Sequence, residues 1–155
     1  MPHLPEDTDP NTWHRYFAIE CNNRTWELVE RPRSPAEDLE MLNAAHASAF
    51  HWGQVGNELN HMRAKMLLAE VHAQLGYGQS AMAYAEEIRG YFLNRDTPDW
   101  ELAFTHAIYA HAAFAAGNSE AHRAAYQEAV KAMNAIADEE DRKIVRKTFD
   151  QVPPP

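Results

Sequence analysis

The sequence predicts an all-α protein built from antiparallel helix hairpins, and three observations support this prediction. Alanine occurs 26 times, whereas the strand-favouring residues valine and isoleucine occur only 6 and 5 times. Alanine has the highest helix propensity, and its small side chain lets helix axes approach closely. Signals for helix starts and stops recur along the chain with short links between them, and short links make neighbouring helices antiparallel.

Two start signals define the first predicted hairpin. Asp9 followed by Pro10 places a capping carboxylate before a proline at the first helical position, which predicts a helix over residues 10–30. The motif Ser34-Pro35-Ala36-Glu37 is typical of a capping box. It predicts a second helix that runs to about residue 52.

Glycines and capping residues divide the remainder of the chain into five more helices. Gly76 and Gly117 are expected to end helices, and Asn57, Asn118 and Asp138 are expected to start them. The dipeptide Thr97-Pro98 repeats the pattern of a cap followed by proline. The predicted helices cover about 57–75, 79–93, 98–116, 118–137 and a last one after 138. Residues 1–9 are expected to be a flexible arm, 10–152 a single helical domain and 153–155 a proline tail.

A glycine turn recurs after about 41 residues, at Leu75-Gly76 and at Ala116-Gly117. The helix after each glycine carries an early alanine and then a tyrosine, at Ala81 and Tyr84 and at Ala121 and Tyr126. Over about 57–133 this pattern resembles the tetratricopeptide repeat (TPR) family, and the whole chain resembles bacterial proteins of unknown function with this helical layout. The resemblance implies a right-handed α-solenoid of about seven helices, with the last helix as a polar-faced cap.

Charge and composition exclude several classes of partner. The formal net charge is −9, which argues against nucleic acid and against an anionic membrane, because both need a positive surface. No apolar run approaches the roughly 20 residues of a membrane-spanning helix. The chain has a single cysteine, Cys21, and its N-terminus is acidic and proline-rich rather than like a signal peptide. We therefore expect a cytoplasmic protein.

The sequence carries no recognisable catalytic motif, so the prediction leans away from an enzyme and includes no cofactor. Gly76-Tyr77-Gly78 lacks the third glycine and the preceding strand of a dinucleotide-binding fingerprint. No Gly-x-Ser-x-Gly motif is present. Cys21 shares a helical stripe with Trp13 and Phe17, which indicates a packed thiol rather than a nucleophile.

No metal site is predicted either. Glu58 and His61 form a single Glu-x-x-His motif, whereas carboxylate-bridged di-iron bundles use two such motifs and two further glutamates. His106 and His111 are five residues apart, which places them about 140° apart around a helix. Ligands that converge from different helices, for example His46, His61 and His106, remain an alternative.

Four polar side chains lie on stripes that are otherwise apolar: Glu20, Asn23, His46 and His106. Buried polar groups need hydrogen-bond partners, so two interpretations are open. Either the four line a ligand-binding pocket inside the stack, or each is satisfied by neighbouring protein groups. The second interpretation is favoured, because buried polar groups are usually paired within the protein.

The leading hypothesis for function is a non-catalytic protein–protein interaction module, because stacked hairpins form concave surfaces. Its partner would be a basic or amphipathic protein segment, or a second copy of the chain in a homodimer. The alternative is a small-molecule or metal-binding helical protein that uses Glu20, Asn23, His46 and His106. An enzyme would need paired titratable groups with shifted pKa values in a cleft.

Overall fold

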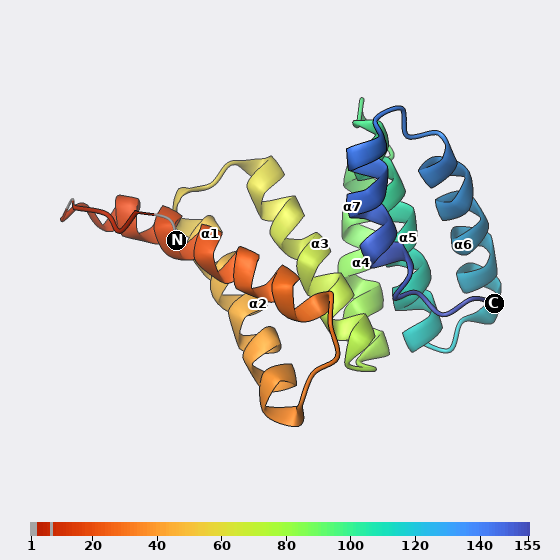
Figure 1. Ribbon diagram of the computed structural model, residues 1–155, viewed down its shortest axis with the longest axis horizontal. Coiled ribbons are helices and arrows are strands. Elements are labelled where there is room, and N and C mark those ends of the chain that lie inside the picture. The colour runs from red at the N-terminus through yellow and green to blue at the C-terminus, as the bar shows by residue number, and fades with distance from the viewer. Residues whose placement is uncertain (1–2, 7) are drawn as a thin grey trace. The chain divides into compact units, whose positions relative to one another are not determined.

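The computed structural model describes residues 3–6 and 8–155, which contain seven α-helices and no strand (Figure 1). The helices are α1 (Pro10–Val29), α2 (Pro35–Val55), α3 (Glu58–Gln74), α4 (Gly78–Phe92), α5 (Asp99–Ala115), α6 (Ser119–Asn134) and α7 (Glu139–Phe149). The all-α prediction is confirmed. Of the arm predicted over 1–9, residues 1, 2 and 7 lie outside the described part, and the others form no helix. No described helix has the length and apolarity that crossing a bilayer requires.

The predicted helix boundaries agree with the structure to within three residues, because most were set by local capping chemistry. Asp9 accepts a hydrogen bond from the Asn11 N–H, and Ser34 and Glu37 form the expected reciprocal capping box. Asn118 and Asp138 also accept from the first turns of α6 and α7. These side chains satisfy N–H groups that would otherwise have no partner inside the helix.

Two local predictions were wrong. Thr97 does not cap α5: its hydroxyl donates to the carbonyl of Phe92, 2.6 Å away, and Pro98 occupies the capping position without a side-chain hydrogen bond. The second helix does not stop near residue 52, because α2 continues through Gly53 as far as Val55. A glycine inside a helix costs only about 1 kcal/mol relative to alanine, so the neighbouring turns override it.

The chain divides into two compact units, Met1–Leu67 and Leu68–Pro155, and α3 begins in the first and ends in the second. In the N-terminal unit, α1 and α2 pack along each other as a hairpin. Small residues bring the two helices together: Ser48 on α2 is fully buried and its hydroxyl donates to the Ala18 carbonyl of α1 at 2.8 Å. At the surface, Arg24 holds both carboxylate oxygens of Glu40, with Nε–Oε1 and Nη2–Oε2 distances of 2.6 and 3.1 Å.

In the C-terminal unit, α5 is the central helix, and α4, α6 and α7 all pack against it. Eleven of the 17 residues of α5 are buried, and small ones among them, such as Ala103, Ala107 and Ala110, let neighbouring helices approach closely. Gly78, the first residue of α4, lies directly against the end of α5. A Cβ atom there would lie only 2.5 Å from Ala116 Cα and 2.7 Å from the carbonyl carbon of Ala115.

The repeated glycine turn predicted from the sequence is present as two matching helix ends. Gly76 and Gly117 have φ values of 79° and 72°, the left-handed conformation that favours glycine. In the first turn the Tyr77 N–H donates to the His72 carbonyl, and in the second the Asn118 N–H donates to the Ala113 carbonyl. Both are Schellman turns, 41 residues apart. The stacking of the hairpins into a right-handed TPR-like solenoid stays a prediction.

Candidate functional site

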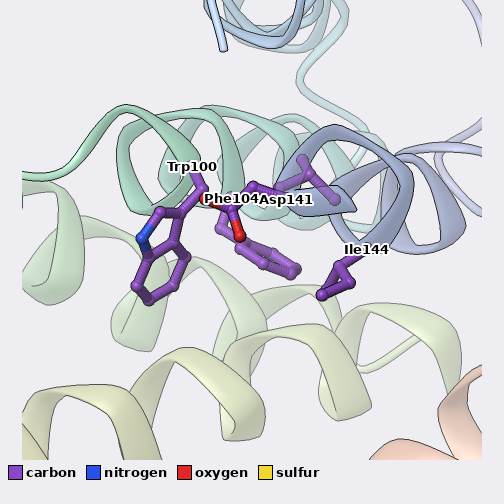
Figure 2. Close-up of a pocket in the computed structure, with 5 residues that line it drawn as sticks. Trp100, Phe104, Asp141 and Ile144 are labelled. Atoms are coloured by element: carbon purple, nitrogen blue, oxygen red, sulfur yellow. The ribbon is translucent and has the colours of Figure 1, made fainter. Parts of the chain in front are cut away.

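An apolar pocket of about 190 Å³ lies between α5 and α7 of the C-terminal unit (Figure 2). Its lining residues are Trp100, Phe104, Asp141, Ile144 and Val145. Trp100 and Phe104 are four residues apart on α5, and Asp141, Ile144 and Val145 are three and four apart on α7, so each set shares one helix face. Helical spacing therefore aims both sets of side chains at the same space.

The walls of this pocket combine rigid aromatic rings with an exposed aliphatic side chain. The rings of Trp100 and Phe104 meet edge to face, with centroids 6.2 Å apart. Phe104 is only 8% exposed, whereas Ile144 is 53% exposed and faces solvent at the mouth. In Figure 2 the Phe104 ring lies between Trp100 and Ile144. Among the lining residues only Asp141, in the first turn of α7, carries a charge.

The pocket is smaller than the roughly 300–1,000 Å³ that is typical of small-molecule sites. Its lining holds one carboxylate, that of Asp141, and no second titratable group beside it. The pocket can bury an apolar side chain of another protein away from water, and the Asp141 carboxylate can pair with a positive charge beside that side chain. An arrangement of this kind suits an anchor residue of a protein partner.

A pair of polar side chains lies in the interior of the same unit. Glu70 of α3 is fully buried, and one of its carboxylate oxygens accepts hydrogen bonds from Gln74 Nε2 at 2.9 Å and from His111 Nδ1 at 3.0 Å. The other oxygen has no hydrogen-bond partner among the described residues. His111 of α5 is also buried. The pair joins α3 to α5. Because both side chains are enclosed, it is poorly placed to meet a substrate from solvent.

The four residues proposed from the sequence as a buried polar set do not share one unit. Glu20, Asn23 and His46 belong to the N-terminal unit and His106 to the C-terminal unit. The expectation of burial was wrong for Asn23 and His46, which are exposed, while Glu20 and His106 are half-buried. Periodicity along one helix does not say how wide a face its neighbour covers, so the stripes drawn from the sequence included positions that are exposed. Whether the four bind a ligand stays a prediction.

Cys21 lies partly buried on α1, with a thiol that is poorly suited to nucleophilic chemistry. Burial, and to a smaller extent the charge of Glu20, raises the pKa of Cys21 above its usual range. The thiolate is the reactive form, so a raised pKa makes this side chain a weak nucleophile at neutral pH.

Sequence reasoning missed Glu70 and His111, although a signal for them was present. The two positions are 41 residues apart, which is the spacing of the glycine turns at Gly76 and Gly117. They are thus equivalent positions of the two repeats. The spacing of Trp100 and Phe104 puts both on one face of α5, and the structure shows that this face reaches the edge of the pocket.

No group of three or more His, Cys, Asp or Glu side chains that could hold a metal ion occurs among residues 3–6 and 8–155. No protein-family model matches the chain, and comparison with curated proteins and with solved structures gave no match either.

Proposed function

We propose that this chain is a non-catalytic protein-interaction module that holds one apolar side chain of a partner in the α5–α7 pocket. The observation that carries the proposal is the pocket itself, where Ile144 stands 53% exposed beside the buried ring of Phe104. Aliphatic and aromatic side chains that stay exposed around a hollow are typical of interaction sites.

The partner's chemistry follows from the pocket and from the net charge. Apolar walls select an aliphatic or aromatic anchor, and Asp141 favours a Lys or Arg next to that anchor. The formal charge of −9 favours approach of a basic or amphipathic segment. A second copy of the chain is a poorer fit, because two strongly acidic surfaces repel each other.

The alternative of a small-molecule or metal-binding protein built on Glu20, Asn23, His46 and His106 has less support. Two of the four are exposed, and His106 belongs to a different unit from the rest. The α5–α7 pocket is also smaller than most small-molecule sites.

A peptide-library selection tests the proposal and does not require an identified partner. Random peptides displayed on phage are selected against the immobilised protein, and the affinity of enriched peptides is measured by fluorescence polarisation. Burial of a large aliphatic side chain is worth about 1.5–3 kcal/mol, so Ile144→Asp should weaken binding by about ten- to a hundredfold. Leu39→Asp is the matched control, because Leu39 is 59% exposed but lies on α2, outside the pocket.

Circular dichroism confirms that both variants keep their helices, and sedimentation velocity measures the oligomeric state. Enriched peptides with an apolar residue beside a Lys or Arg, bound by Leu39→Asp but not by Ile144→Asp, support the proposal. Peptides that bind Ile144→Asp as tightly as the original protein contradict it. A dimer that Ile144→Asp converts to a monomer would instead assign the pocket to a second copy.

A further inference from the structure

Two histidines from different helices face each other in the N-terminal unit. His14 lies on α1 and His51 on α2, and their Nδ1 atoms are 2.8 Å apart. Both rings are half-buried, with the His14 ring near Phe50 and the His51 ring 5.6 Å from the Phe17 ring, centroid to centroid. The hairpin brings the two imidazoles together, and the aromatic neighbours pack beside them.

A neutral imidazole ring can present a lone pair to a metal ion. A neutral histidine has one donor and one acceptor nitrogen, so at 2.8 Å one Nδ1 donates its proton to the other. Moving the shared proton from Nδ1 to Nε2 of the same ring leaves two lone pairs on facing atoms without any change in net charge.

The two nitrogens are close enough to reach the same metal ion. Metal–imidazole bonds are about 2.0 Å long, so two nitrogens on adjacent corners of a square lie about 2.8 Å apart. In a tetrahedral site the same bonds place the nitrogens about 3.3 Å apart. The observed 2.8 Å is the length of the N–H···N hydrogen bond between the rings, and each ring must turn to aim a lone pair at an ion, so this distance puts both nitrogens within reach of one ion without selecting its geometry. Cu²⁺ is favoured over Zn²⁺ because divalent metals bind a given imidazole site in the Irving–Williams order, in which Cu²⁺ binds most tightly.

We propose that His14 and His51 form a two-imidazole binding site for Cu²⁺, in which the two Nδ1 atoms occupy adjacent equatorial positions. Each ring turns about its soft χ2 torsion until its lone pair points at the ion rather than at the other ring. Water fills the other positions, since the described residues contain no third His, Cys, Asp or Glu close enough to bind the same ion. The site lies in the N-terminal unit and does not depend on the α5–α7 pocket.

Isothermal titration with Cu²⁺ and with Zn²⁺ tests the proposal, using protein without an affinity tag. A His3→Ala background removes the histidine nearest the N-terminus. His14→Phe and His51→Phe each remove one ligand nitrogen and keep an aromatic ring in place. His46→Phe is the matched control, because His46 is an exposed histidine on α2, five residues before His51. Circular dichroism confirms that each variant folds.

The expected result is one Cu²⁺ per chain with a Kd in the micromolar range and Zn²⁺ at least tenfold weaker. His14→Phe and His51→Phe each weaken Cu²⁺ binding at least tenfold, and His46→Phe does not. Electron paramagnetic resonance should show a tetragonal Cu²⁺ signal with coupling to two nitrogens. A Kd above 100 μM, unchanged affinity in His14→Phe and His51→Phe, or a spectrum with a single nitrogen ligand would overturn the proposal.

Discussion

Replacement of Gly78 by alanine should destabilise the protein, although alanine is the better helix former. Gly78 begins α4 where that helix meets the end of α5, and an added Cβ would contact the carbonyl oxygen of Ala115 and lie 2.5 Å from Ala116 Cα. These are backbone atoms that cannot rotate away. Overpacking of this kind costs about 1–3 kcal/mol, which exceeds the gain in helix propensity at the first position of a helix.

Gly90→Ala on the same helix is the matched control and should have the opposite effect. A Cβ at Gly90 would meet nothing within 4 Å, so only the propensity gain of about 0.5–1 kcal/mol applies. Urea unfolding followed by circular dichroism measures both. A loss of about 2 kcal/mol in Gly78→Ala corresponds to a Tm about 4–8 °C lower. If Gly78→Ala is as stable as Gly90→Ala, the described packing of α4 on α5 is wrong.

Three further predictions concern polar groups. Replacement of His111 by alanine leaves the buried carboxylate of Glu70 with Gln74 as its remaining donor. The free energy of unfolding measured in urea should fall by about 3–5 kcal/mol. A fall of less than about 1 kcal/mol would contradict a buried pair. Burial lowers the pKa of His106 in the folded protein. As the pH falls, the unfolded chain therefore takes up the proton at this position before the folded protein does, so stability decreases below a pH of about 7. The free energy of unfolding of His106→Gln should depend less steeply on pH between about 8 and 5 than that of the original protein. Ser48→Ala removes a buried hydrogen bond to the Ala18 carbonyl and should cost about 1 kcal/mol in the same urea assay, whereas an unchanged midpoint would mean that this bond contributes nothing.

The helices were predictable from the sequence because their ends are decided by neighbouring residues. The Ser34 capping box and the glycine turns at Gly76 and Gly117 act over at most six residues, and each appears in the structure as expected. Thr97 shows where this reasoning failed. A threonine before proline can cap the next helix or donate back to the previous one, and only the path of the loop decides between the two.

The candidate sites were harder to predict because each needs two helices in a particular register. The four-residue spacing of Trp100 and Phe104 puts them on one helix face, but spacing does not say whether α7 covers that face fully or leaves a pocket. The pairs Glu70–His111 and His14–His51 join residues 41 and 37 positions apart. Distances of that kind depend on interhelix packing, to which many side chains contribute at once.

Nuclear magnetic resonance of methyl groups can show whether the α5–α7 pocket holds the apolar side chain of a bound peptide. Protein with labelled Ile and Val methyls is titrated with a peptide from the library selection, and intermolecular nuclear Overhauser effects are recorded. We expect contacts from the apolar side chain of the peptide to Ile144 and Val145, with the largest changes in methyl chemical shift at these two residues. Shifts confined to the N-terminal unit, with no contact to either methyl-bearing residue, would contradict it.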